Sequence, residues 1–209
     1  MNNAEIILAS GSPRRQDILK QMGLRYTVEP QDVDESFAGM TAENEARRLA
    51  AKKVQTCIDN RWPVSGRENP LGDWILGADT FIVYKGLFMG KPADRSDARR
   101  MLKLLADNTH TVITGLALNI ACDIAPRDGK PLMTTAVCRT EVTFAPMSDD
   151  EIEWYLDTDE WRDVAAAYRI QEKAAMFISS IQGSWSNVMG LPINTFYGML
   201  RANNFNFRS

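Results

Sequence analysis

The chain has 209 residues, of which 44% are hydrophobic, and a formal net charge of −3. This size and composition allow a sizeable hydrophobic core in one domain or in two closely packed lobes. An acidic chain is a poor partner for duplex nucleic acid, because binding to the phosphate backbone normally needs a basic surface. No apolar run reaches the length of a transmembrane helix and the first residues lack a signal-peptide pattern, so we expect no membrane partner.

The few cysteines and the single histidine exclude several kinds of site. Cys57, Cys122 and Cys138 are far apart and odd in number, which disfavours a zinc ribbon or a disulfide framework and favours a reducing, cytoplasmic location. A Ser-His-Asp triad, a Cys-His protease or a multi-histidine zinc site would depend on His110 alone. His110 lies in a strand-like run, and we interpret it as structural. Catalysis is therefore expected to rely on carboxylates and cations, with or without a metal.

An apolar strand near the N-terminus runs through a small polar turn into a predicted helix. Ser12 suits the N-cap, and Pro13 suits the first helical position, where its missing N–H is no loss. The unpaired N–H groups of the first turn, together with the charges of Arg14 and Arg15, favour binding of an anion. From these residues alone, an anion site and an ordinary turn with two solvated arginines both stay open.

A second helix is predicted over residues 41–59, and its buried face carries a lysine. The apolar residues of that face are Ala46, Leu49, Ala50 and Cys57. At ~100° per residue, Lys53 lies on the same face, whereas Lys52 points away from it. Lys53 either extends its aliphatic stem to the rim of the core or is a cation held over a cleft.

The most apolar segment, residues 74–84, is predicted to be a strand that is covered on both faces. Asp79 interrupts it and shares a face with Ile75 and Phe81. An unpaired carboxylate in such surroundings would be costly or would shift its pKa, so it needs a cation, a metal or a hydrogen-bond network. The alternative is an aspartate that caps a bend beside Gly77.

The other segments alternate between strand and helix patterns, which predicts an α/β or α+β layered fold. Their predicted states are a loop over 60–73, a hairpin turn at 85–86, a strand over 87–89, a helix over 96–106, strands over 109–120 and 134–144, a turn over 123–131, a helix opened by a capping box at Ser148, a helix after Pro192 and a frayed end over 203–209.

Several cations and carboxylates are thus candidates for one site. Pro92 favours an extended Lys91 at the end of the sheet, against the alternative of a solvated loop lysine. The candidate carboxylates are Asp79 and those in residues 32–35. Cations gathered with carboxylates suit a polyphosphate and a divalent ion, so a hydrolase of phosphoanhydrides follows as a hypothesis. No glycine-rich Walker or dinucleotide pattern is present.

Six motifs resemble the Maf family of nucleoside triphosphate pyrophosphatases, in order along almost the whole chain. They occupy residues 10–15, 34–35, 77–80, 90–92, 168–171 and 187–192. The resemblance implies an inosine-triphosphatase-like α/β fold in one domain over residues 1–209, with a long mixed β-sheet flanked by helices that form two lobes around a cleft. It also implies release of diphosphate from a nucleoside triphosphate, a divalent metal cation such as Mg²⁺ or Mn²⁺, a cytoplasmic location and a homodimer.

The resemblance also assigns roles by position. Asp79 matches the family's catalytic acidic residue, which is proposed as the base for the attacking water. Glu35 matches an acidic residue near metal or water, and Asp79 is a second candidate metal ligand. The positions that contact phosphate in the family correspond to Ser10, Arg14, Arg15, Lys53 and Lys91.

The position after Ser-Pro separates two branches of the family. The branch that favours 7-methyl-GTP usually has a tryptophan there, and this chain has Arg14. Arg14, Thr80 and Gln171 match positions tied to base selection in the branch that acts on dTTP and UTP, with modified pyrimidine nucleotides as further candidates. Two alternatives are a 7-methyl-GTP-type pyrophosphatase and a non-catalytic nucleotide-binding regulator of cell division. The carboxylates of Glu35 and Asp79 disfavour the regulator.

Overall fold

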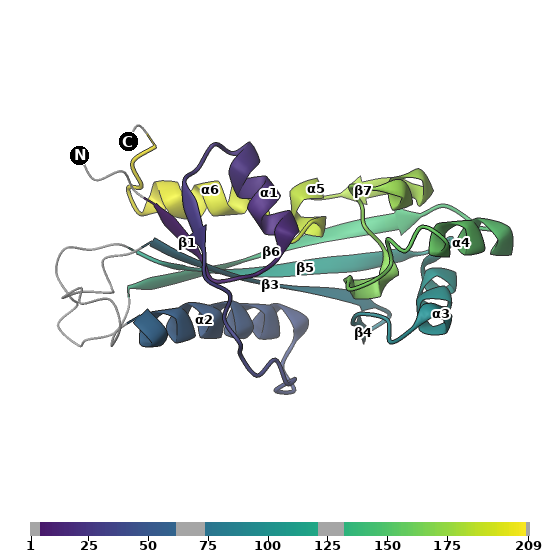
Figure 1. Cartoon of the computed structure of the whole chain (residues 1–209), viewed down its shortest axis with the longest axis horizontal. Coiled ribbons are helices and arrows are strands. Elements are labelled where there is room, and N and C mark those ends of the chain that lie inside the picture. Colours follow the sequence, from purple (N-terminus) through teal and green to yellow (C-terminus); the bar gives the residue numbers. More distant parts are fainter. Residues whose placement is uncertain (1–4, 62–73, 121–131, 208–209) are drawn as a thin grey trace. The chain divides into compact units, whose positions relative to one another are not determined.

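The computed structural model describes residues 5–61, 74–120 and 132–207. Within these ranges, seven strands form one open, mixed sheet flanked by helices, in the order β2-β1-β3-β5-β6-β7 with β4 paired to β3 (Figure 1). The predicted α/β class and mixed sheet are thus confirmed. The predicted turn over 123–131, most of the predicted loop over 60–73 and Cys122 lie outside the described residues.

Five of the strands lie close to their predicted positions, whereas β2 and β7 were not predicted. They are β1 (Ile6–Leu8), β2 (Tyr26–Val28), β3 (Trp74–Tyr84), β4 (Leu87–Met89), β5 (Thr109–Asn119), β6 (Met133–Phe144) and β7 (Ile178–Gln182). β1 pairs in parallel with β2 and with β3, whereas the pairs β3–β4 and β6–β7 are antiparallel.

The helices α1, α2, α3, α4 and α6 lie close to their predicted positions, whereas α5 and the 3-10 turns were not predicted. They are α1 (Pro13–Gln21), α2 (Ala42–Arg61), α3 (Arg95–Leu105), α4 (Asp149–Leu156), α5 (Trp185–Val188) and α6 (Ile193–Ala202), with 3-10 turns η2 (Ala165–Ala167) and η3 (Lys173–Phe177). The capping box at Ser148 is present with both of its hydrogen bonds to Glu151. α2 continues through Asn60 and Arg61, so the prediction that these two residues belong to a loop is wrong.

Contacts along the chain divide it into two compact units. The first unit comprises the described parts of Met1–Asp79, Thr114–Val137 and Gly190–Ser209, and the second comprises Thr80–Ile113 and Cys138–Met189. The strands β3, β5 and β6 contribute residues to both units. The cleft between two lobes stays a prediction.

In the first unit, α2 packs very closely against one face of the sheet. A Cβ atom at Gly77 would lie 2.3 Å from the carbonyl oxygen of Ala50, and one at Gly115 would lie 2.2 Å from the carbonyl carbon of Ala46. Only glycine allows the helix backbone to approach the strands so closely. Gly77 therefore lies in a continuous strand as the contact point of α2, and it does not mark a bend that Asp79 caps.

The opposite face of β3 packs against the C-terminal segment of the same unit. Side chains alternate along a strand, so Trp74 points away from the face of Ile75 and Gly77. The Trp74 ring meets Phe205 edge-on, with the ring centroids 5.1 Å apart, and Phe205 is buried. The prediction of a frayed end is therefore wrong for the part around Phe205, because its aromatic side chain is anchored in the core.

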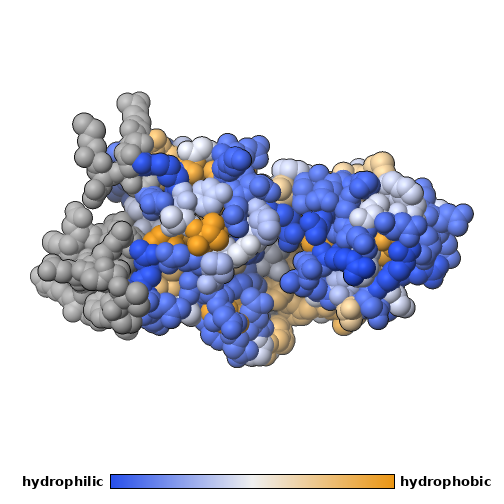
Figure 2. Space-filling view, viewed as in Figure 1, coloured by the Kyte–Doolittle hydropathy of each residue, from blue (hydrophilic) through white to orange (hydrophobic). Residues whose placement is uncertain are grey.

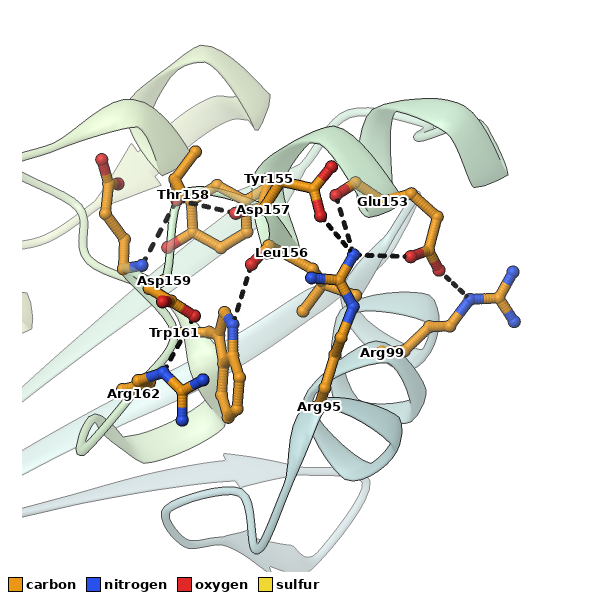
Figure 3. A network of polar contacts seen from close by, with 11 residues as sticks. Arg95, Arg99, Glu153, Tyr155, Leu156, Asp157, Thr158, Asp159, Trp161 and Arg162 are labelled. Atoms are coloured by element: carbon orange, nitrogen blue, oxygen red, sulfur yellow. Dashed lines mark hydrogen bonds and ion pairs between the residues drawn. The ribbon is translucent and has the colours of Figure 1, made fainter.

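In the second unit, α3 and α4 are linked by charged side chains at the surface. Arg95 donates to Glu153 and Asp157, and Arg99 donates to Glu153 (Figure 3). The buried residues of α3 are Ala98, Met101, Leu102 and Leu105. The face in Figure 2 is mostly hydrophilic, with small groups of hydrophobic residues.

Candidate active site

The centre of the candidate site is a lysine between two carboxylates. Lys53 Nζ lies 2.5 Å from Asp79 Oδ1 and 2.7 Å from Glu35 Oε1. Lys53 comes from the sheet-facing side of α2, Asp79 from β3, and Glu35 from the segment between β2 and α2. Lys53 and Asp79 are buried, whereas the Glu35 side chain is 58% exposed. Lys53 is thus a cation held against the sheet and not a lysine that reaches the rim to be solvated.

Close packing explains why Lys53 reaches Asp79. Gly77 and Asp79 lie on the same face of β3, because they are two residues apart. Ala50, whose carbonyl lies over Gly77, precedes Lys53 by one helical turn. The approach of α2 at Gly77 therefore brings Lys53 over the next residue on that face, which is Asp79.

Arg15 is fixed beside this centre by two hydrogen bonds. Its Nη1 donates to Ser10 Oγ at 2.7 Å, and its Nε donates to the carbonyl oxygen of Gly190 at 2.8 Å. Ser10 Oγ also accepts from the backbone N–H of Ser12, at 3.3 Å. Ser12 occupies the N-cap position of α1, but its side chain makes no capping hydrogen bond. Ser10 and Arg15 are buried, whereas Arg14 is half-buried.

The charges of the site perturb one another. Burial raises the pKa of Asp79, and the neighbouring Lys53 and Arg15 partly oppose that rise. Burial lowers the pKa of Arg15, with Asp79 acting in the opposite direction and Arg14 in the same direction. A buried carboxylate with a raised pKa beside cations is an arrangement suited to a general base.

Three candidates belong to the second unit. Thr80 directly follows Asp79 in β3 and is half-buried, and Lys91 is exposed after β4. Gln171 is half-buried, and its Oε1 atom is buried without a hydrogen-bond partner in the part of the chain that the structure describes. The structure places Ser10, Arg15, Glu35, Lys53 and Asp79 together in the first unit. The functional roles of all these residues stay predictions.

His110 has the surroundings of a structural residue. It is buried, and its Nε2 atom lies 2.8 Å from the hydroxyl of Tyr168. Its ring also packs near those of Phe144 and Tyr168. Burial lowers the pKa of His110 to about 4, so it is neutral near pH 7.

The sequence analysis missed the residues that hold the segment carrying Glu35. Glu45 is fully buried in α2 and accepts hydrogen bonds from the backbone N–H groups of Ala38 and Met40. The signal was available, since Glu45 lies next to Ala46 on the predicted buried face of that helix. A glutamate at such a position needs partners.

The carboxylates fit a metal that is shared with phosphate. Within the described ranges, no group of three or more His, Cys, Asp or Glu residues could hold a metal ion. Glu35 and Asp79, however, lie against the same Lys53 nitrogen. Magnesium is commonly bound by one or two carboxylates together with substrate phosphates, which matches this donor set.

None of the described helices combines the length and hydrophobicity that a membrane span requires.

The geometry agrees with the relationships found by comparison. The family described as Maf-like protein matches residues 5–203 of this chain. A dTTP/UTP pyrophosphatase of Symbiobacterium thermophilum is 40% identical over 197 residues, covering 94% of this chain and 92% of that protein. The chain belongs to the Maf-like family.

Two further relatives have the same name and similar coverage. A dTTP/UTP pyrophosphatase of Acetivibrio thermocellus is 42% identical over 199 residues, covering 94% of each chain. One from Halalkalibacterium halodurans is 38% identical over 204 residues, covering 97% of this chain and 98% of that protein.

Proposed function

We propose that this chain is a nucleoside triphosphate pyrophosphatase that hydrolyses dTTP and UTP to the monophosphate and diphosphate. Its relatives carry that activity in their names, over nearly the whole length of the chain. The observation that carries the proposal is the buried Asp79–Lys53 pair, with Glu35 and Arg15 beside it. This cluster combines a base with fixed positive charges, which hydrolysis of a phosphoanhydride needs.

In the proposed reaction, Asp79 takes a proton from the water that attacks the α-phosphorus. The bond between that phosphorus and the bridging oxygen breaks, and diphosphate leaves. Burial raises the pKa of Asp79, which strengthens the carboxylate as a base. Lys53 keeps this carboxylate oriented and offsets negative charge that develops on the phosphates.

The turn before α1 is proposed as the phosphate-binding element. Arg15 offers a planar guanidinium whose position is fixed by Ser10 and by the Gly190 carbonyl. Arg14 adds a second charge at the first turn of α1, where the helix dipole also favours an anion. Lys91 keeps its proposed contact with phosphate, and Arg14, Thr80 and Gln171 keep their proposed part in base selection.

Glu35 and Asp79 are the proposed ligands of a divalent metal, Mg²⁺ or Mn²⁺. Such an ion would neutralise phosphate oxygens and orient the triphosphate. The Glu35 side chain is 58% exposed, so its carboxylate is accessible to a metal that arrives with the nucleotide. A cytoplasmic location and a homodimer complete the proposal.

A substrate screen with product analysis tests the proposed function. Purified protein is incubated with common and modified nucleoside triphosphates, including 7-methyl-GTP, with and without Mg²⁺, and diphosphate and monophosphate release are measured separately. We expect metal-dependent diphosphate release, fastest with dTTP and UTP. Fastest turnover of 7-methyl-GTP would favour the other branch of the family, and a stable complex with unhydrolysed dTTP would favour a regulator.

A further inference from the structure

The segment that carries Glu35 has no regular backbone structure of its own. Residues 29–41 connect β2 to α2 and belong to neither a helix nor a strand. Two of its large hydrophobic side chains, Phe37 and Met40, are 55% and 46% exposed. Burial of these two side chains therefore contributes little to the conformation of the segment.

Two polar contacts from one face of α2 bracket Glu35, and Ser36 also donates to the Asp34 carboxylate within the segment. Arg48 Nη2 donates to the carbonyl oxygen of Ser36 at 2.8 Å, and Lys52 Nζ donates to that of Asp34 at 2.9 Å. The two carbonyl groups belong to the residues on either side of Glu35. The backbone of Glu35 is thus held from both sides by side chains of the helix that also provides Lys53.

Glu45 holds the same segment a few residues further along. Its Oε1 atom accepts from the N–H groups of Ala38 at 2.5 Å and Met40 at 3.4 Å, and its Oε2 atom accepts from Arg48 Nε at 2.8 Å. Burial opposes ionisation of Glu45, but the hydrogen bonds from Arg48 and from these two N–H groups outweigh it and lower the pKa.

The spacing of Glu45, Arg48 and Lys52 lets all three contact the same segment. Glu45, Arg48 and Lys52 are three and four positions apart, so they lie along one stripe of α2. The ends of their side chains form hydrogen bonds with residues 34–40, and one further bond joins Arg48 to Glu45. Arg47, their neighbour, is exposed and donates to Asn44 within the helix.

We propose that Glu45 and Arg48 are positioning residues that hold Glu35 at Lys53 and Asp79. This inference rests on the proposed function, because the effect of Glu35 on turnover is part of it. The Glu45–Arg48 pair fixes the backbone on the C-terminal side of Glu35, and the carboxylate of Glu35 then meets the Lys53 ammonium. Neither positioning residue needs to touch the nucleotide.

The test combines hydrogen exchange with kinetics in the full chain. Arg48→Ala is the main variant because Arg48 is partly exposed and is not one of the buried residues of α2. Glu45→Gln is the second variant, and Arg47→Ala is the matched control. We expect faster exchange in peptides covering residues 34–41 for both variants, but not for the control. We also expect kcat for diphosphate release to fall about tenfold, since small displacements of reacting groups are costly.

A second comparison separates positioning from a general structural role. In a Glu35→Gln background, Arg48→Ala should cause no further loss of kcat, because the group that it positions is already gone. Equal loss in both backgrounds, or wild-type exchange over 34–41 in both variants, overturns the proposal. A wild-type protein that releases no diphosphate overturns the proposed function instead, and the exchange data still show whether Glu45 and Arg48 anchor the segment.

Discussion

Two groups of charged residues, one in each unit, differ in the direction in which the pKa of a carboxylate is shifted. In the second unit, hydrogen bonds from Arg95 and Arg99 lower the pKa of Glu153, so pairing at the surface favours the charged form. In the first unit, burial raises the pKa of Asp79 even though Lys53 is adjacent. The same residue types thus form a solvated network in one unit and a buried cluster in the other.

The difference lies in how much water each group keeps. The Asp157 side chain in the network of Figure 3 is 71% exposed, so pairing with Arg95 costs little hydration and gains little stability. Asp79 and Lys53 have lost nearly all their water, which makes each charge costly and strongly dependent on its partner. A cluster that is costly to form, next to a candidate anion site, is better explained by function than by stability.

The largest expected effect comes from neutralising the buried carboxylate. Asp79→Asn should lower kcat for diphosphate release by about 10²–10⁴-fold, because the proposed general base is lost. Because burial raises the pKa of Asp79 in the folded state, this group favours folding at pH values below its pKa in the unfolded chain. That contribution to stability is lost as the pH rises through its pKa in the folded state. The variant should stay folded at pH 7, measured by thermal unfolding, because Glu35 still faces the Lys53 ammonium.

Two outcomes would contradict this view of Asp79. Wild-type turnover by Asp79→Asn would remove Asp79 from the reaction. A large fall in melting temperature would mean that the carboxylate is present for stability. In the wild type, activity should fall as pH drops through the raised pKa of Asp79, since the base must be ionised.

His110 is a buried titratable group in the second unit, so it can show whether burial shifts a pKa in that unit as well. Burial lowers the pKa of His110 to about 4, so the unfolded chain takes up a proton at a higher pH than the folded chain does. Stability should therefore be fully present above pH 6.5 and fall by about 3 kcal/mol as pH drops toward 4. Urea unfolding at several pH values measures this.

His110→Gln provides the control for that measurement. His110 is the only histidine in the chain, so the variant should show little change in stability between pH 7 and about 5.5, where carboxylates are still mostly ionised. An identical pH dependence in the wild type and the variant would show that His110 is not the source.

The packing at Gly77 tests how the buried cluster is assembled. In Gly77→Ala, the new Cβ atom would lie 2.3 Å from the Ala50 carbonyl oxygen and 2.8 Å from Val54 Cγ2. α2 must then move, so we expect a loss of about 1–3 kcal/mol in unfolding free energy and a lower kcat as Lys53 leaves Asp79. Urea unfolding and diphosphate release measure the two effects.

Gly198→Ala is the matched control for the Gly77 substitution. Gly198 lies in α6 with no atom within 4 Å of an added Cβ, so alanine should stabilise the helix by about 0.5–1 kcal/mol. If Gly77→Ala left stability and turnover unchanged, the close approach of α2 would not be needed for the site.

The smallest effect is expected in the surface network. Arg99→Ala removes the ion pairs to Asp149 and Glu153, and should lower the melting temperature by only about 1–2 °C. The difference should vanish in about 1 M salt, because solvent-exposed pairs are screened. Diphosphate release should be unchanged. A large fall in melting temperature that persists at high salt would mean that this network, like the Asp79–Lys53 pair, is shielded from solvent.

Local patterns in the sequence predicted much of the fold and the centre of the site. The helical spacing around Ala46 and Ala50 put Lys53 on the buried face of α2, and strand parity put Asp79 on a covered face of β3. Both predictions are confirmed because a buried charge within a regular apolar pattern demands a partner wherever the element packs. The capping box at Ser148 is confirmed for a different reason, because its contacts join residues only three positions apart.

Other features depended on contacts that no local pattern reveals. Arg15 is held by the carbonyl of Gly190, which lies 175 positions away in the sequence. The burial of Phe205 depends on Trp74, so composition alone misread the end of the chain as frayed. The sequence left open a bend at Gly77, whereas the tertiary structure places the carbonyl oxygen of Ala50 against it.

The sequence by itself determined which residues must be buried and which charges would then need partners, because helix and strand periodicity fix the direction of each side chain. Only the tertiary structure decided which partner each charge met. The segment around Glu35 has no periodicity, so its conformation depends on Glu45 and Arg48 of a helix that follows it. Specific long-range hydrogen bonds of this kind leave no repeating signal in the sequence.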